Sequence, residues 1–261
     1  MAGADKRLHV VYFSPSGTTQ MVARTFAKGT GLLQVEHDLL RDRSSESVSF
    51  AAGDVAAFFF PVFAGRIPAV CADALKRFST EGSPAVAIVV FGNRAYDDAL
   101  LELRDILAER GFVVFAAAAF VAQHSIFPAV AHGRPDDEDK RKIASFGAEC
   151  AQKLSSLNAG EAIGQVSVPG KLPYVKPASV PLCPTASSLC DGCGACARIC
   201  PTAAIPQDNP RKTNKSLCIC CTACIAVCPR RARAFRSPVY AIAAKAFAAK
   251  NAERKEAETF I

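Results

Sequence analysis

The sequence CDGCGACARICP at residues 190–201 and the sequence CICCTACIAVCP at residues 218–229 decide how the second half of the chain folds. Each has the cysteine spacing C-x2-C-x2-C-x3-C-P, and the pattern repeats after 28 residues, from Cys190 to Cys218. Three thiolates separated by two residues each can surround one corner of an iron–sulfur cluster in a tight turn, and this spacing is typical of such centres. The small Gly and Ala residues between the thiolates fit such a turn.

The fourth cysteine of each run lies about one helical turn beyond the third and points away, so it binds the other cluster. The spacing therefore predicts two [4Fe–4S] clusters, one held by Cys190, Cys193, Cys196 and Cys228 and the other by Cys218, Cys221, Cys224 and Cys200. A zinc site or a disulfide framework is the alternative, which two tandem runs closed by proline disfavour. The remaining cysteines are expected to be unligated: Cys71 and Cys150 as small core residues, and Cys183 and Cys220 without an assigned role. Residues 183–236 resemble the two-cluster bacterial ferredoxins.

The chain has 261 residues, half of them hydrophobic, which suits one large or two ordinary domains with a sizeable core. The amino terminus leads into an apolar run without a secretory leader pattern, and the longest apolar run, residues 112–122, is too short to span a bilayer. The cysteine spacing favours metal binding over disulfides, which indicates a reducing compartment. We therefore expect a cytoplasmic protein of an anaerobic cell.

Five apolar runs in the first part of the chain alternate with helical patterns, at residues 8–13, 32–37, 54–60, 85–91 and 112–121. This alternation predicts a doubly wound parallel sheet, whose ligands bind beyond the carboxyl ends of the strands. The first run is followed by SPSGTT at residues 14–19 and then by a helical pattern. Backbone N–H groups at a helix start, with four hydroxyls, suit a phosphate monoester, and the lack of a P-loop lysine argues against a nucleoside triphosphate. Taken alone, the turn also fits an ordinary capped helix.

The loops after three of these runs resemble the cofactor loops of the flavodoxin family. The turn Ser14-x-Ser16-Gly17-x-Thr19 is similar to the flavodoxin phosphate loop, residues 61–66 to the second flavin loop and residues 92–98 to the third. Joined to a two-cluster ferredoxin, they resemble the flavodoxin–ferredoxin fusion family of the EFR1 type over nearly the whole chain. The resemblance implies an α/β fold with a flavodoxin-like five-stranded doubly wound parallel sheet, followed by a small α+β two-cluster ferredoxin domain.

The same resemblance implies which residues bind FMN. They are Ser14, Ser16, Gly17, Thr18 and Thr19 at the phosphate, Pro61, Val62, Phe63, Ala64, Gly65 and Arg66 along one face and the N5 edge of the ring, and Gly92, Asn93, Arg94 and Tyr96 along the other face. The chain has no Trp, which flavodoxins often stack on the ring, so Phe63 and Tyr96 are the expected stacking residues. Arg66 and Arg94 either contact the flavin or are solvated, and Asp97 and Asp98 are expected to cap the next helix.

The chain divides into four parts. Residues 1–160 form the flavodoxin-like domain, residues 161–182 a linker that its prolines keep semi-extended, residues 183–236 the ferredoxin domain, and residues 237–261 a C-terminal helix. Ser237 and Pro238 give that helix a cap and a first-turn proline, and we expect it to fold onto one of the domains. The arginines of RRARAFR at residues 230–236 either compensate the charge of a nearby cluster, which is the interpretation adopted here, or form a docking patch for an acidic partner.

The sequence therefore predicts a soluble electron-transfer protein that relays electrons between FMN and two [4Fe–4S] clusters, to or from a partner redox protein. The alternative is an FMN-dependent reductase of a small substrate that its own clusters feed with electrons, and a third class is a redox sensor with a regulatory partner. No catalytic residue is assigned, because His124 and Tyr96 are the only candidate proton donors near the flavin loops.

Charge gives no support for nucleic-acid or membrane binding. The formal net charge is +7, but eight ligating thiolates, two cluster cores and a flavin phosphate bring the loaded protein to roughly neutral. The expected partner is another redox protein. The oligomeric state stays open, a homodimer included.

Overall fold

The five apolar runs form the central strands β1 (Arg7–Tyr12), β2 (Leu33–Asp38), β3 (Val55–Pro61), β4 (Pro84–Phe91) and β5 (Val113–Val121). The computed structural model describes residues 6–51, 53–156, 163–178 and 181–261. These strands pair in parallel in the order β2-β1-β3-β4-β5, which is the flavodoxin-like order of a doubly wound sheet. The predicted fold class is confirmed. A sixth strand, described below, extends the sheet beyond β5.

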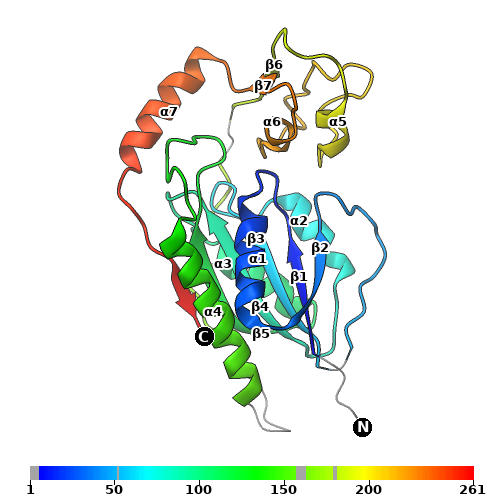
Figure 1. The fold of residues 1–261 in the computed structure, drawn as a ribbon, viewed down its shortest axis with the longest axis vertical. Coiled ribbons are helices and arrows are strands. Elements are labelled where there is room, and N and C mark those ends of the chain that lie inside the picture. Colours follow the sequence, from blue (N-terminus) through cyan, green and yellow to red (C-terminus); the bar gives the residue numbers. More distant parts are fainter. Residues whose placement is uncertain (1–5, 52, 157–162, 179–180) are drawn as a thin grey trace.

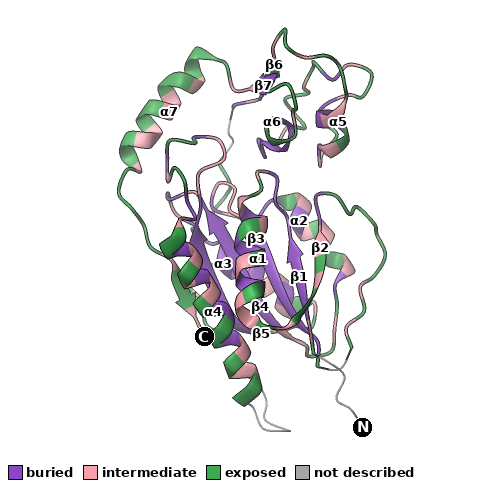
Figure 2. Ribbon diagram, in the orientation of Figure 1, coloured by how far each residue is buried: buried purple, intermediate pink, exposed green. Residues whose placement is uncertain are grey.

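Helices cover both faces of the sheet, because each strand turns alternate side chains to opposite sides. On one face, Phe59 and Phe120 pack with Phe26 of α1 (Thr18–Thr30) and Phe146 of α4 (Asp137–Ser156). On the other face, Phe58 packs with residues of α2 (Ala69–Ala74), the 3-10 turn Leu75–Arg77 and α3 (Ala99–Glu109). Strands β1, β3, β4 and β5 are therefore buried on both sides, as Figure 2 shows, whereas the edge strand β2 is partly exposed.

The cysteine-rich part lies over the carboxyl ends of the strands (Figure 1). It contains the short helices α5 (Ala195–Ile199) and α6 (Ala223–Ala226) and the antiparallel strands β6 (Thr185–Ala186) and β7 (Arg233–Ala234). The backbone repeats with the sequence: Gly192 and Gly194 have φ of 79° and 72°, and their counterparts Cys220 and Thr222 have φ of 55° and 67°. A left-handed conformation costs a residue with a Cβ about 1–2 kcal/mol, so the second half holds two strained residues where the first half has glycine.

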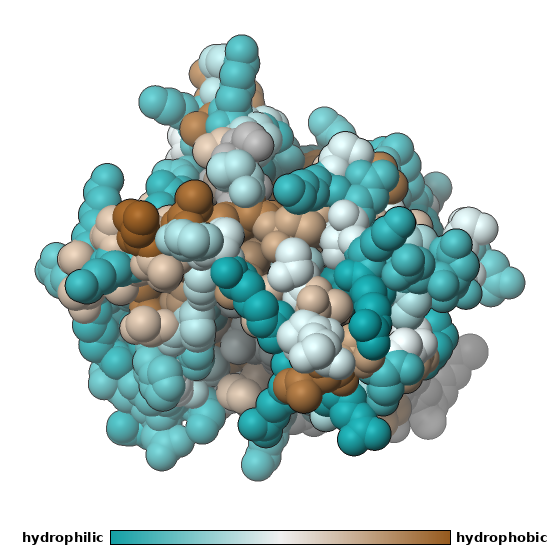
Figure 3. Space-filling view, turned by 90° about the horizontal axis from the view of Figure 1, so that it is seen from above, coloured by the Kyte–Doolittle hydropathy of each residue, from teal (hydrophilic) through white to brown (hydrophobic). Residues whose placement is uncertain are grey.

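The end of the chain returns to the sheet. Helix α7 (Pro238–Lys250) begins as predicted, with Ser237 Oγ accepting a hydrogen bond from Tyr240 N at 3.1 Å and Pro238 in the first turn. The helix ends at Lys250, and β8 (Glu258–Phe260) then pairs antiparallel with β5, so the expectation of a helix over the whole tail is wrong beyond residue 250. The outer face of α7 exposes apolar side chains, which gather on the α7 side of the molecule in Figure 3.

The linker is held against α3. The Asp98 carboxylate accepts hydrogen bonds from the backbone N–H groups of Lys171 at 3.1 Å and Val175 at 2.6 Å, and Tyr174 Oη donates to Asp105 at 2.7 Å. Asp98 precedes α3 but makes no side-chain cap to it, so its predicted capping role is wrong. Residues 163–178 of the predicted linker contain no helix or strand, and its predicted boundary at residue 160 lies outside the described residues.

No helix in the described parts of the chain has the length and apolar character needed to cross a membrane.

Candidate functional site

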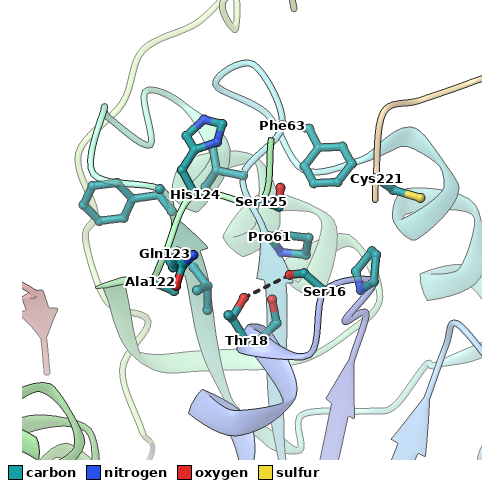
Figure 4. Close-up of a pocket in the computed structure, with 15 residues that line it drawn as sticks. Ser16, Thr18, Pro61, Phe63, Ala122, Gln123, His124, Ser125 and Cys221 are labelled. Carbon is teal, nitrogen blue, oxygen red and sulfur yellow. Dashed lines mark hydrogen bonds between the residues drawn. The ribbon is translucent and has the colours of Figure 1, made fainter. Parts of the chain in front are cut away.

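A cavity lies at the carboxyl edge of the sheet, where the loops after β1, β3, β4 and β5 meet (Figure 4). These loops supply Pro15, Ser16, Thr18 and Thr19 from the first, Pro61, Val62 and Phe63 from the second, Val90, Phe91 and Gly92 from the third, and Ala122, Gln123, His124 and Ser125 from the fourth. One further residue, Cys221, comes from the cysteine-rich part. The cavity thus combines three predicted flavin loops with two segments that sequence reasoning did not assign to the site.

The first loop presents backbone donors at the start of α1. Gly17 precedes the helix with φ of 90°, and no side chain caps the first turn from that position. Ser14 Oγ instead accepts a hydrogen bond from Gln20 N at 2.8 Å, one turn into the helix, while the hydroxyls of Ser16 and Thr18 lie 3.2 Å apart at the cavity. Uncapped N–H groups at a helix start favour an anion. The loop therefore fits a phosphate monoester, with Ser14 serving the fold of the loop.

The second loop is a tight hairpin beside the cavity. Phe63 and Arg66 exchange backbone hydrogen bonds of 2.8 and 3.1 Å around Ala64 and Gly65, whose φ values of 51° and 86° are those of a two-residue turn with left-handed backbone. The turn holds Phe63 at the cavity, beside Cys221 (Figure 4). Phe63 is thereby placed where an aromatic ring could stack on a flavin.

Six residues predicted to border the flavin do not line this cavity: Ala64 and Gly65 of the turn, and Arg66, Asn93, Arg94 and Tyr96. Arg66 forms a two-bond ion pair with Glu102, at 2.7 and 2.8 Å, and lies over the Tyr174 ring of the linker. Arg94 pairs with Asp97 on the surface. The amide of Asn93 binds the carbonyls of Asn251 and Glu253 and the N–H of Lys255, and Tyr96 Oη donates to Glu258 at 2.7 Å. These side chains hold the linker and the returning tail, so the expected stacking role of Tyr96 has no support in its position.

His124 is a cavity residue for which the sequence predicted no cofactor role. Its Nδ1 accepts hydrogen bonds from the backbone N–H groups of Ile126 and Phe127, both at 3.2 Å, which requires an unprotonated Nδ1. Burial and the nearby Arg94 charge lower the pKa of His124 to about 4. A Cβ added to Gly92 would come within 2.6 Å of the imidazole, so only glycine allows this close approach. The ring is therefore a neutral, fixed wall of the cavity at neutral pH.

Two further cavities lie in the cysteine-rich part, and each collects four of the cysteines predicted to act together. One is lined by Cys190, Cys193, Cys196 and Cys228, and the other by Cys200, Cys218, Cys221 and Cys224. The fourth cysteine of each run thus joins the three of the other run. We call the first set the distal thiols and the second the proximal thiols.

The thiols suit clusters better than a single ion. In the described residues, no three side chains of His, Cys, Asp or Glu converge closely enough to hold one metal ion. Burial raises the pKa of Cys221 and Cys224 to about 12, while a hydrogen bond with Cys220 lowers the pKa of Cys218 to about 6. Coordination to iron deprotonates thiols that are otherwise neutral. The donor set and its spread around a cavity fit a [4Fe–4S] centre in each place.

The proximal thiols lie against the flavodoxin-like part. Cys221 and Ala223 are buried in the hydrophobic core that also contains Ile67 and Cys71, with Ile219 packed against it. Burial and the nearby Cys221 raise the pKa of Cys71, a residue of α2. Of the residues that line the described cavities, Cys221 alone borders both the loop cavity and the proximal cavity. Cys221 is therefore the residue through which the two cavities adjoin.

Comparison with known proteins identifies part of this arrangement. The family described as "4Fe-4S binding domain" matches residues 187–205. No curated protein matches the chain. Among solved structures, the chain is similar to a flavodoxin from the domain Archaea (15% identity, covering 57% of this chain and 99% of that one, TM-score 0.44) and to flavodoxin 1 from Bacillus cereus (21%, 59% and 100%, TM-score 0.44).

A third similar structure is the rubredoxin oxygen:oxidoreductase from Desulfovibrio gigas, with 12% identity and a TM-score of 0.41. That match covers 59% of this chain and 38% of the other protein. The fold assignment rests on the strand order described above, and the 4Fe–4S assignment on the matched residues and the thiols around the two cavities.

Proposed function

We propose that this chain is an electron-transfer protein with three cofactors in series: FMN in the loop cavity, a [4Fe–4S] cluster on the proximal thiols and a second on the distal thiols. The observation that carries this proposal is the position of Cys221, which borders both the loop cavity and the proximal cavity. A cluster ligand in the wall of a flavin cavity would place the two cofactors next to one another. The arrangement is the one expected of the EFR1-type fusion family.

The two ends of the loop cavity fit the two ends of FMN, the phosphate and the ring. The start of α1, where Gly17 offers no side-chain cap, would hold the phosphate together with the Ser16 and Thr18 hydroxyls, and Phe63 would lie along the ring. When bound, FMN supplies the link between two-electron and one-electron chemistry. On the side that faces the proximal thiols, the ring would lie between the protein groups Phe63 and Cys221, which both line the cavity.

The positions of two arginines favour a carrier over a substrate reductase. The reductase alternative needs a charged or proton-donating group at an open flavin face. Arg66 is committed to Glu102 and Arg94 to Asp97, and Tyr96 donates its hydroxyl to Glu258. His124 is the remaining candidate; its Nδ1 accepts two backbone N–H groups, so its proton is on Nε2, and its pKa, lowered to about 4 by burial and Arg94, leaves it without the extra proton of an acid at neutral pH. We infer a relay that acts with a redox partner protein in the reducing cytoplasm of an anaerobic cell.

Anaerobic reconstitution followed by redox titration, read by visible absorbance and EPR, tests this proposal. The wild-type protein should hold one FMN and two [4Fe–4S] clusters. Cys221→Ala should lose one of the two cluster signals and weaken FMN binding, because this residue serves both cavities. Cys150→Ala, which removes a buried thiol from α4, is the matched control and should keep all three cofactors. A wild-type protein that binds no flavin, or a Cys221→Ala variant with both clusters intact, would refute the proposal.

A further inference from the structure

The two halves of the cysteine-rich part differ in charge at equivalent positions. Around the distal thiols the chain carries Asp191, Arg198, Arg230, Arg231 and Arg233, and 28 residues away, around the proximal thiols, the counterparts are Ile219, Ala226, Thr202, Ala203 and Ile205. The backbone at these positions is alike, since Ala203 and Arg231 both have left-handed φ, of 51° and 48°. The repeat thus provides an internal comparison: the charged side chains of the set lie at the distal site, except that Arg233 lies between the two sites and also binds Pro184 and Thr213 of the proximal cavity.

Charge compensation does not explain this asymmetry. A cluster with four thiolates is anionic, and an ion that is buried pays a larger desolvation penalty than an exposed one. The proximal thiols are the more buried set, with Cys200, Cys221 and Cys224 below a tenth exposed, yet no charged residue lines their cavity. The distal set includes the exposed Cys193, and its cavity borders Arg230 and Arg233. The cations are therefore placed where solvent would already screen the cluster.

One of these arginines is buried and braces the fold, whereas the others are exposed. Arg233 is 2% exposed and donates to the carbonyls of Pro184, Pro210 and Lys212 and to the Thr213 hydroxyl. In contrast, four exposed arginines form what we call the arginine collar: Arg198, Arg211, Arg230 and Arg231.

The collar is centred on the exposed edge of the distal site. Arg198 donates to the carbonyl of Cys193 at 3.0 Å and Arg211 to that of Cys190 at 2.5 Å, which fixes both guanidinium groups beside ligand residues. Arg230 pairs with Asp191 across 3.0 Å, with side chains 65% and 41% exposed. Exposed pairs of this kind add little stability, so the fold gives no strong reason for the collar.

We propose that the arginine collar is the docking surface for an acidic one-electron redox protein, which exchanges electrons with the distal cluster. This inference rests on the proposed function. Three of the proximal thiols are buried, and Cys221 lies in the core shared with the flavodoxin-like part, whereas the distal set includes the exposed Cys193, so the distal site is the more exposed of the two. A basic rim around an exposed redox centre attracts and orients a carboxylate-rich surface. In each encounter one electron leaves a reduced [4Fe–4S] cluster, which returns to its oxidised state, and the partner's centre gains that electron.

Two cobalt oxidants of opposite charge test the collar without knowledge of the partner. The reduced holoprotein is mixed anaerobically with tris(oxalato)cobaltate(III), an anion, or with hexaamminecobalt(III), a cation, and each complex takes one electron from a cluster. The test variant is Arg198→Gln, Arg230→Gln, Arg231→Gln. The control variant, Arg24→Gln, Lys28→Gln, Arg141→Gln, removes the same charge from the groove between α1 and α4.

At low ionic strength the collar variant should react about tenfold more slowly than wild type with the anion, and faster with the cation. High salt should abolish both differences, and the control variant should behave like wild type with both oxidants. If the rates with both oxidants change equally in the collar variant and the cluster potential shifts, docking is overturned in favour of charge compensation. Docking is also overturned if the collar variant and the control variant react at the same rates. EPR of the reduced wild-type protein, recorded before mixing, distinguishes failure of the docking proposal from failure of the proposed function. If this spectrum does not contain the signals of two clusters, both proposals are overturned.

Discussion

At the scale of single residues, protonation of the His124 imidazole would disrupt the loop that lines the cofactor cavity. Its Nδ1 accepts two backbone N–H groups of the loop that it belongs to, so protonation at this atom would break both hydrogen bonds. Burial and the Arg94 charge lower its pKa to about 4, from 6.5 for an ordinary histidine. Because the folded state disfavours the charged form, this residue contributes stability that is complete above pH 6.5 and is lost as the pH falls toward 4.

We therefore expect the thermal midpoint of the holoprotein to fall as the pH is lowered from about 7 to 5, and to fall less in the His124→Gln variant. Glutamine can still accept a hydrogen bond through its side-chain oxygen but cannot take up a proton in this range. Acid lability of the clusters is common to both proteins, so the difference between the two curves reports on His124 alone. Parallel curves would show that His124 is not the group that titrates.

At the scale of elements, the linker is fixed by one carboxylate at the start of α3. Asp98 accepts hydrogen bonds from two backbone N–H groups of the linker. The neighbouring Asp97 instead forms an ion pair with the exposed Arg94. A hydrogen bond to a charged acceptor contributes about 1.5–3 kcal/mol, whereas an exposed ion pair contributes about 0–1 kcal/mol. We therefore expect Asp98 to contribute much more free energy than Asp97 to the binding of the linker, although the two residues are adjacent and of the same type.

Asp98→Asn should destabilise the docked linker by about 2 kcal/mol, since it removes the charge and one of the two acceptor oxygens. Amide hydrogen exchange at Lys171 and Val175 should then be roughly 30-fold faster than in wild type. Asp97→Asn is the control, because asparagine tolerates the left-handed backbone of Asp97, with φ of 43°. Equal exchange rates in the two variants would mean that other contacts hold the linker.

Local patterns predicted the elements and the cysteine sets well. The apolar runs became β1 to β5. The four cysteines that the spacing assigns to each cluster line one cavity, with Cys220 beside them at the proximal one, and their binding of iron stays a prediction. Ser237 and Pro238 marked the start of α7 correctly. Each of these features is determined by residues that lie close together in the chain, so a short stretch of sequence is enough to predict it.

The roles of the third flavin loop depend on a distant segment, and for that reason the sequence did not reveal them. Asn93 and Tyr96 bind Asn251, Glu253 and Glu258, more than 150 residues further along the chain. The short strand β8 has too few residues for a recognisable pattern. The sequence could assign Cys221 only to a cluster. That Cys221 also borders the loop cavity depends on how the two parts of the chain pack, which the local spacing of cysteines does not reveal.

At the scale of the whole molecule, the ferredoxin-like part is seated in the edge of the flavodoxin-like part rather than tethered beside it (Figure 1). Residues 219–223 contribute to the same hydrophobic core as α2 and α3, the linker is bound along α3, and the tail returns to pair with β5. Three separate contacts therefore fix one geometry between the loop cavity and the thiols. The proposed electron transfer within one molecule requires such a fixed geometry.

The central claim, that the loop cavity and the proximal thiols hold adjacent cofactors, is tested most directly by flash photoreduction of the bound flavin. An external photoreductant delivers one electron to the flavin, and absorbance follows its arrival at the clusters. The account predicts a first-order rate constant that is independent of protein concentration, retained in Cys193→Ala, which alters only the distal site, and lost in Cys221→Ala. A rate that rises in proportion to protein concentration, or one that Cys221→Ala leaves unchanged, would contradict it.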